Sequence, residues 1–265
     1  MKYANWNVPE RGAEIPRALL AAGCTPLLAA ILHLRGLSDP AAARSFLRGG
    51  AETLTNPLEL TGMVDAVQRL TRAVATGEHV AVYGDYDVDG ITAACLLTDY
   101  LRFRGLTCEL KIPDRIRDGY GLNTAAIDTL AEKGVTLIVT VDCGVTNLEE
   151  TAYAAQRGVD MIVTDHHEGR EALPEAEAVV DPKQPDSSGV GTALAGVGVA
   201  FKLVCAMDGD ADKMLARYGD LVAVGTVADV MPLLGENRFI TRCGLQKIAA
   251  GDCRPGFPAL AEEAG

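Results

Sequence analysis

Three aspartates stand at alternate positions directly after a short apolar run. Asp85, Asp87 and Asp89 follow residues 80–82, Val-Ala-Val. Carboxylates that are crowded together repel one another, and burial further disfavours the charged form of each. A divalent cation removes this conflict, because it is the largest local charge in such a site and keeps its carboxylate ligands ionised. The spacing also fits an Asp-rich turn that caps a following helix, which we expect to begin near Ile91.

Four more potential ligands each follow a predicted strand or helix directly. They are Asp142 after the run 136–141, His166 and His167 after the run 159–164, and Asp229 after the helix 211–228. The carboxyl ends of parallel strands share one edge of a sheet, so we expect these side chains to converge there with Asp87 and Asp89. Such a mixture of oxygen and nitrogen ligands suits Mn²⁺ or Mg²⁺ better than a thiolate-preferring metal. The number of carboxylates predicts two ions, which together can clamp the attacking and leaving oxygens of an in-line displacement.

Each cluster also has an ordinary structural interpretation. The adjacent histidines can lie exposed at a helix N-terminus, Asp142 can be a turn residue, and Asp229 can cap a loop. Cys143 is a possible ligand, but we expect a buried thiol packed under the turn. The joint position of all these clusters at the ends of predicted elements favours the metal site.

An alternation of strand and helix patterns begins at His79. The strand candidates are 79–84, 107–112, 136–141, 159–164 and 177–181, and the helix candidates are 61–76, 91–104, 123–133, 146–157, 192–208, 211–228 and 238–250. The strands are continuous apolar runs, which are typical of parallel sheets covered on both faces. We therefore predict an α/β fold with a doubly wound, mainly parallel five-stranded sheet and helices on both faces.

The first 56 residues predict a helical N-terminal segment that packs as a preface to this domain. Thr25-Pro26 and Ser38-Asp39-Pro40 are helix starts, and Gly49-Gly50 is a helix end. The domain itself is expected at 57–250. Residues 251–265 are expected to form a tail or the start of a connection to a further domain.

Composition limits the class of protein. Hydrophobic residues make up 48% of the 265 residues, and no run approaches the roughly 18 apolar residues of a membrane helix. The N-terminus lacks the apolar stretch of a signal peptide. The seven cysteines include no Cys-x-x-Cys pair, which is typical of free thiols in the cytoplasm. The net charge of -12 argues against a broad electrostatic grip on DNA, although a catalytic cluster that binds cations is compatible with a nuclease.

Four short motifs resemble, in order and spacing, those of the DHH phosphoesterases. They are Gly-Asp-Tyr-Asp-Val-Asp-Gly at 84–90, Val-Asp-Cys-Gly at 141–144, Asp-His-His at 165–167 and Gly-Thr-Val-Ala-Asp at 225–229. The segments between them resemble the RecJ-like subfamily of single-strand-specific exonucleases. These segments are 112–115, 119–123, 194–203, 221–229 and 235–238. The resemblance covers roughly residues 55–250, and several ordered motifs are far more specific than one.

The resemblance implies a role for each matching residue. Asp87 and Asp89 would bind one metal ion each, Asp142 would bridge both ions, and His166 and Asp229 would complete the second site. His167 would face the scissile phosphate, while Asp85 and Asp165 would orient the ligands by hydrogen bonds. His167, Asp142 and Asp85 are thus the candidate catalytic residues. One departure is Tyr83, where many relatives have a histidine, and it implies a less firmly held first ion.

The resemblance further implies hydrolysis of single-stranded DNA from the 5′ end, in DNA repair and recombination, with two Mn²⁺ or Mg²⁺ ions. A phosphodiesterase of small oligonucleotides or cyclic dinucleotides is one alternative, and a non-catalytic module that binds single strands or a partner protein is another. RecJ-like proteins have a second α/β domain, yet only 36 residues follow Asp229. We therefore expect an N-terminal part whose partners are single-stranded DNA and the missing C-terminal domains, with no membrane contact.

Overall fold

The structure is a computed structural model that describes residues 15–116, 119, 121–170, 172–187 and 189–265. The chain divides into two compact units, Met1–Thr53 and Leu54–Gly265. Of the helical segment expected at 1–56, residues 1–14 lie outside the described residues.

The first unit is helical over its described residues. Its helices are α1 (Arg17–Ala21), α2 (Pro26–Leu34), α3 (Pro40–Arg48) and the short 3₁₀ helix η1 (Ala51–Thr53). The predicted starts of α2 and α3 are confirmed: the Leu28 N–H donates to the Thr25 hydroxyl at 3.3 Å, and the Ala42 N–H donates to the Asp39 carboxylate at 2.8 Å. The small core of this unit consists of Leu19, Ala29, Leu32 and Ala43.

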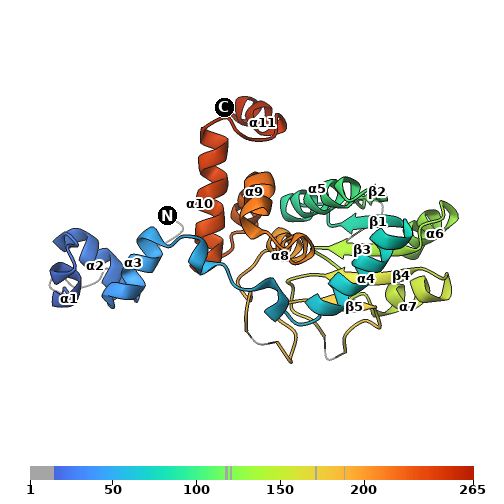
Figure 1. Ribbon diagram of the computed structural model, residues 1–265, viewed down its shortest axis with the longest axis horizontal. Helices are drawn as coiled ribbons and strands as arrows, with labels where there is room; N and C mark the ends of the chain where they lie inside the picture. The colour runs from blue at the N-terminus through green and yellow to red at the C-terminus, as the bar shows by residue number, and fades with distance from the viewer. Residues whose placement is uncertain (1–14, 117–118, 120, 171, 188) are drawn as a thin grey trace. The chain divides into compact units, whose positions relative to one another are not determined.

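The second unit is built on one five-stranded sheet (Figure 1). Its strands are β1 (His79–Gly84), β2 (Thr107–Lys111), β3 (Leu137–Val141), β4 (Asp160–Thr164) and β5 (Ala178–Val180). Their order is β2-β1-β3-β4-β5, and all four pairs are parallel. The predicted doubly wound α/β fold is therefore confirmed, with each strand within two residues of its expected limits.

The helices of this unit are η2 (Pro57–Glu59), α4 (Met63–Thr76), α5 (Val88–Phe103), α6 (Thr124–Glu132), α7 (Leu148–Gln156), α8 (Gly196–Asp208), α9 (Ala211–Ala228), α10 (Gly235–Ala249) and α11 (Gly256–Ala264). Helices α4, α5 and α8 pack on one face of the sheet and α6 and α7 on the other, whereas α10 packs on α9 and extends away from the sheet (Figure 1). Three expected starts were wrong: α5 begins at Val88 rather than Ile91, α8 at Gly196 rather than 192, and α10 at Gly235 rather than 238. Helix α11 lies where a tail or connection was expected.

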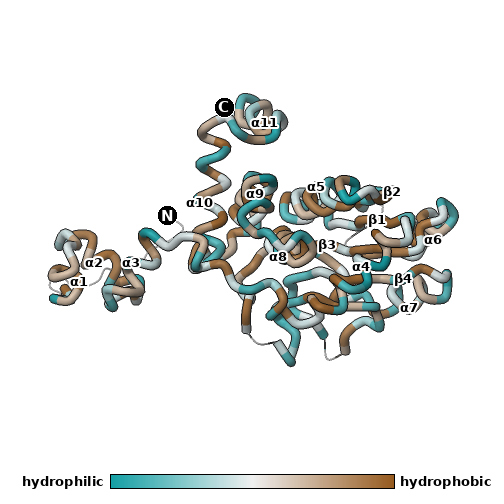
Figure 2. Tube along the Cα trace, viewed as in Figure 1, coloured by the Kyte–Doolittle hydropathy of each residue, from teal (hydrophilic) through white to brown (hydrophobic). Residues whose placement is uncertain are grey.

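The two faces of the sheet bury two separate cores, because successive side chains of a strand point to opposite sides. Val80, Val82 and Val139 pack with α4, α5, α8 and α9 in the larger core. Ala81 and Ile138 pack with α6 and α7 in the smaller one. Figure 2 shows the hydrophobic residues concentrated along these strands. The sheet is thus a rigid frame whose carboxyl edge can position side chains.

A buried ion pair fixes α8 to α10. The Lys202 ammonium, with a side chain 2% exposed, donates to Glu236 Oε2 and to Thr55 Oγ1, each at 2.8 Å. Glu236 in turn accepts from the Thr55 hydroxyl and N–H. Because the side chains of Lys202 and Glu236 are only 2% and 9% exposed, removing the lysine leaves a carboxylate without its counter-charge.

We expect Lys202→Met to lower the free energy of unfolding by about 3 kcal/mol, because breaking one side of a buried ion pair leaves the other charge uncompensated. Urea unfolding followed by circular dichroism measures this loss. The double variant Lys202→Met/Glu236→Leu should recover most of it. A loss below about 1 kcal/mol in the single variant would contradict this role.

Candidate metal centre

The strand order places a topological switch point between β1 and β3. From β1 the chain moves outward to β2 on one side, and β3, β4 and β5 follow on the other. In open α/β sheets a crevice forms outside the carboxyl ends of the two strands at such a point, and ligands bind there. Asp85 follows β1 and Asp142 follows β3 directly, so the sheet brings these two carboxylates to the same crevice.

The start of α5 separates the roles of two neighbouring aspartates. Asp87 is the N-cap, and its Oδ1 accepts the Gly90 N–H at 2.9 Å. The helix therefore includes Asp89, which is 1% exposed, whereas Asp87 is exposed. A Cβ at Gly90 would lie 2.5 Å from the Asp85 carbonyl oxygen, so the tight entry into α5 requires glycine. The prediction of a turn reaching to Ile91 was wrong because Asp87 itself caps the helix.

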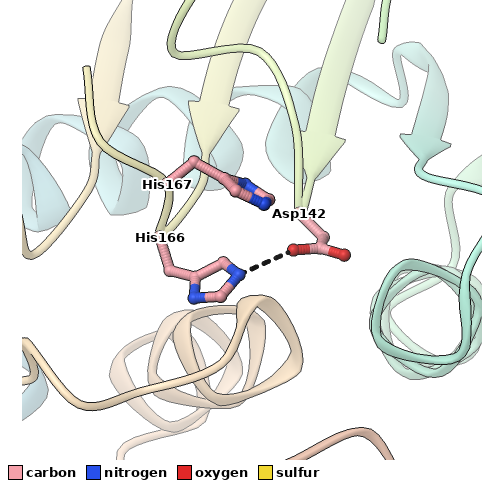
Figure 3. A group of neighbouring side chains, drawn as sticks. All are labelled: Asp142, His166 and His167. Carbon is pink, nitrogen blue, oxygen red and sulfur yellow. Dashed lines mark ion pairs between the residues drawn. The ribbon is translucent and has the colours of Figure 1, made fainter. Parts of the chain in front are cut away.

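Asp142 is held in an uncommon backbone conformation at the end of β3. Its φ is 61°, a left-handed conformation that aspartate tolerates better than most residues. The side chain is buried, and its Oδ1 lies 3.1 Å from His166 Nε2. Figure 3 shows both histidines approaching Asp142 from the loop that follows β4. Cys143 is fully buried beneath this turn, as predicted.

Asp165 fixes the position of the two histidines by hydrogen bonds. Its Oδ1 accepts the backbone N–H of His166 at 2.7 Å and lies 2.8 Å from His167 Nδ1, while its Oδ2 accepts the Val145 N–H at 3.0 Å. The His167 side chain remains 44% exposed. The hydrogen bond with Asp165 orients the His167 ring beside Asp142 and His166.

The C-terminus of α9 supplies the last carboxylate. Asp229 is the C-cap, and its Oδ2 lies 3.7 Å from His166 Nε2. Two backbone bonds fix this end: the Val230 N–H donates to the Val227 carbonyl, and the Met231 N–H donates to the Thr226 carbonyl. This is a Schellman motif, whose left-handed position is usually glycine. Here it is Val230, with φ 58° and a side chain 86% exposed.

We expect Val230→Gly to raise the free energy of unfolding by about 0.5–1 kcal/mol. A β-branched residue is strained at positive φ, and the exposed side chain loses little packing. Urea unfolding of both proteins in EDTA measures the difference. A decrease in stability would show that the valine side chain makes packing contacts that outweigh its strain.

Within the described residues, the potential ligand atoms form three groups whose members lie within 4.8 Å of one another. The groups are Asp85, Asp87 and Asp142; Asp89, His166 and Asp229; and Asp142, His166 and His167. Every residue predicted to bind metal belongs to at least one group. Asp142 links the first group to the third, and His166 links the third to the second.

The donor set fits divalent cations. In the described part of the chain, Asp142 Oδ1 and both ring nitrogens of His166 are buried and make no hydrogen bond, although Oδ1 and Nε2 lie 3.1 Å apart. Unsatisfied buried groups of this kind are costly and need a partner. Carboxylate oxygens are the ligands that suit Mn²⁺ and Mg²⁺, and the neutral imidazole nitrogen of histidine is a common metal ligand beside them. The residues present are thus suited to hold such ions.

The pKa values of three buried aspartates also indicate that the site lacks positive charge. Burial, followed by the charges of Asp89 and Asp87, raises the pKa of Asp142 to about 10. Burial also raises the pKa of Asp89 to about 6, although the N–H groups of Val197 and Gly196 oppose this shift. Burial raises the pKa of Asp85 as well. A bound cation would favour the ionised forms of all three carboxylates.

His167 differs from these carboxylates because it is stabilised in its charged form. The hydrogen bond with Asp165 raises the pKa of His167 to about 9. Burial acts to raise the pKa of Asp165, but its hydrogen bonds, above all with His167, bring that pKa below the ordinary value. The pair is therefore an imidazolium and a carboxylate at neutral pH, with the positive charge at the edge of the crevice.

Two residues alter the picture expected from the sequence. Tyr83 is fully buried in the smaller core, where its hydroxyl donates to the Gly121 carbonyl at 3.1 Å. Asp181, which follows β5, was not predicted. It is 1% exposed, burial raises its pKa to about 6, and the charges of Asp165 and His166 act on it. It is the last residue of the predicted strand 177–181, and this place at a strand end was the available signal.

Comparison with known proteins agrees with this geometry. The family described as DHH family, N-terminal domain matches residues 79–226. The single-stranded-DNA-specific exonuclease RecJ of Bacillus subtilis is 41% identical over 225 residues, covering 84% of this chain and 28% of the relative. The protein of the same name from Dickeya dadantii is 39% identical over 267 residues, covering 96% of this chain and 45% of the relative.

Solved structures give the same result. The structure of RecJ in complex with Mn²⁺ from Thermus thermophilus superimposes with a TM-score of 0.75 at 32% identity, covering 96% of this chain and 36% of that one. The structure of an exonuclease RecJ bound to manganese superimposes with a TM-score of 0.69 at 36% identity, covering 80% of this chain and 53% of that one. The chain belongs to the DHH family. It spans less than half the length of the two curated relatives named above.

Among the described residues, none of the helices combines the length and the apolar character needed to cross a membrane.

Proposed function

We propose that this chain carries the metal centre of a single-strand-specific DNA exonuclease that hydrolyses phosphodiester bonds from the 5′ end. The observation that carries the proposal is the overlap of three ligand groups through Asp142 and His166 at the β1/β3 switch point. Two adjacent groups that share a carboxylate suit a pair of ions that act on one phosphate.

Asp87 and Asp142 would hold one divalent cation, Mn²⁺ or Mg²⁺, and Asp89, Asp142, His166 and Asp229 would hold the other. Asp85 lies in the first group and would support it as a ligand or as a hydrogen-bond acceptor. Such cations supply Lewis-acid chemistry, because they lower the pKa of water and neutralise charge on phosphate oxygens. Asp165 would position His167, and the sheet edge would hold the ligands in a fixed arrangement.

His167 would stabilise the charge that develops on the phosphoryl oxygens. Its imidazolium form is favoured by Asp165, and its half-exposed ring lies beside Asp142 and His166. A positioned donor aimed at developing charge acts mainly on the transition state.

We expect His167→Gln to lower kcat by about a hundredfold or more while the affinity for Mn²⁺ changes little. The reason is that glutamine loses the positive charge but removes none of the proposed ligands. Steady-state kinetics and calorimetric titration with Mn²⁺ measure the two effects. A matching loss of Mn²⁺ affinity would instead make His167 a ligand, as its place in the third group allows.

The choice of substrate follows from the relatives, whose names specify single-stranded DNA. We propose the same substrate, with a role in DNA repair and recombination, and we propose that the further parts found in the longer relatives help to hold the strand. All seven cysteines are free, which supports a reducing compartment, the cytoplasm.

Product analysis tests the proposed function. A single-stranded oligonucleotide labelled at the 5′ or the 3′ end is incubated with Mn²⁺, beside the matching duplex and a dinucleotide. We expect the 5′ label to leave at once as mononucleotide, the 3′ label to pass through a ladder of shortened strands, and the duplex to resist. Internal cleavage, the opposite polarity or faster hydrolysis of the dinucleotide than of the strand would overturn the proposal.

A further inference from the structure

The segment 194–203 is similar to RecJ-like proteins but contains none of the proposed ligands. In the structure all but its first two residues form the first turns of α8. The N-cap residue, Ala195, offers no side chain to the free N–H groups of this helix. Those groups must therefore find partners elsewhere.

Asp89 is that partner. The Gly196 N–H donates to Asp89 Oδ2 at 2.6 Å, and the Val197 N–H donates to Asp89 Oδ1 at 2.8 Å. Both carboxylate oxygens are thus fixed by a helix that begins 107 residues later in the chain. A helix N-terminus carries partial positive charge, so this contact also favours the ionised carboxylate.

Gly196 also lies in close contact with the carboxylate of Asp142. A Cβ at this position would lie 2.5 Å from both Cβ and Oδ1 of Asp142 and 2.7 Å from its Cγ. Real Cβ atoms do not approach so closely, so either the helix or the aspartate would have to move. Asp142 has little freedom to retreat, since its φ of 61° is set by the turn after β3 and its side chain is buried.

The helix has little freedom to retreat either. Its Lys202 is bound to Glu236 and Thr55, and its buried residues Val199 and Phe201 belong to the larger core. The backbone of α8 is therefore a fixed surface between Asp89 and Asp142.

We infer that Gly196 is a positioning residue of the metal centre: its N–H aims Asp89, and its lack of a side chain leaves the space in which the Asp142 carboxylate reaches both ligand groups. This inference rests on the metal-binding part of the proposed function. It gives the segment 194–203 a role in setting the distance between two carboxylates that lie far apart in the sequence.

The test compares Gly196→Ala with Gly198→Ala, two identical substitutions in one helix. The three heavy atoms nearest to a Cβ at Gly198 all belong to the Leu194 side chain, at 3.0–3.6 Å, so a small shift of that side chain makes room. Calorimetric titration with Mn²⁺ should show at least about tenfold weaker binding for Gly196→Ala and an affinity close to wild type for Gly198→Ala. The rise in Tm on adding Mn²⁺ should shrink only in Gly196→Ala. A merely structural defect would lower the Tm with Mn²⁺ and the Tm without it equally, so the rise would stay the same. Unchanged Mn²⁺ affinity in Gly196→Ala would overturn the inference.

A stability cycle without metal tests the steric part separately, and it does not depend on the nuclease activity. In EDTA, Gly196→Ala should lower Tm by about 5 °C in the wild-type background. In an Asp142→Gly background, where the obstructing side chain is gone, the same change should shift Tm by less than about 2 °C. If Gly196→Ala alone does not fold, the double variant should. Equal losses in both backgrounds, or an unfolded double variant, would overturn the inference.

Discussion

Asp142→Asn should lower the rate of single-strand hydrolysis by roughly a thousandfold, because several kcal/mol of charge stabilisation depend on the ions that this carboxylate joins. Asparagine is the informative substitution, since it retains the size of the side chain and tolerates the φ of 61° at this position. Asp142 also links two of the three ligand groups, so its loss should weaken both ion sites. Single-turnover assays at saturating Mn²⁺ measure the rate of the chemical step.

Asp186→Asn is the matched control for this variant. It makes the same change of charge at an exposed position in the loop after β5, and its rate should equal that of the wild type. If Asp142→Asn retained near wild-type turnover while Asp186→Asn was normal, the assignment of Asp142 as the shared ligand would be wrong.

Removal of divalent cations should lower Tm by about 5–10 °C. Binding to the folded state alone adds about 2.7 kcal/mol when the ligand is at a hundred times its Kd, and each kcal/mol shifts Tm by about 2–4 °C in a chain of this size. Without a cation, burial disfavours the ionised forms of the carboxyl groups at 85, 89 and 142 and raises their pKa values, and the charge of Asp89 adds to the shift at Asp142. A bound cation removes this cost in the folded state. Thermal unfolding in EDTA, Mg²⁺ and Mn²⁺ measures the shifts, and we expect the larger rise with Mn²⁺.

Two controls separate a specific site from general screening of negative charge. Sodium chloride at matched ionic strength should leave Tm nearly unchanged, because buried pairs are screened little by salt. Asp142→Asn should lose most of the rise with Mn²⁺. An equal rise in wild type and variant would contradict a centre built around Asp142.

The sheet and the convergence of its acids could be predicted from the sequence because both depend on local patterns. Apolar runs such as 137–139 and 161–163 identify buried parallel strands, and residues directly after such strands must share one edge. The proximity of Asp142, His166 and His167 could therefore be predicted from the sequence. The structure confirms the strands and brings these three side chains together.

Other features depend on contacts between distant segments, which no local pattern encodes. The start of α5 was placed too late because the acidic turn was expected to extend to Gly90, whereas Asp87 is the cap and Asp89 already lies in the first helical turn. The close approach of Gly196 to Asp142 and the capping of α8 by Asp89 arise only when α5, β3 and α8 pack together. Helix α11 was not predicted, because residues 251–265 were expected to form a tail or a connection. Its start, with Pro255 as the N-cap and Pro258 in the first turn, is compatible with the acceptance of proline at the start of a helix.

Anomalous diffraction from crystals of this protein grown with Mn²⁺ tests the central claim most directly. We expect two peaks about 3.5–4 Å apart at the carboxyl ends of β1 and β3, with Asp142 in contact with both. Asp87 should bind one ion, and Asp89, His166 and Asp229 should bind the other. A single peak, or peaks that lie away from Asp142, would contradict a two-metal centre at this edge of the sheet.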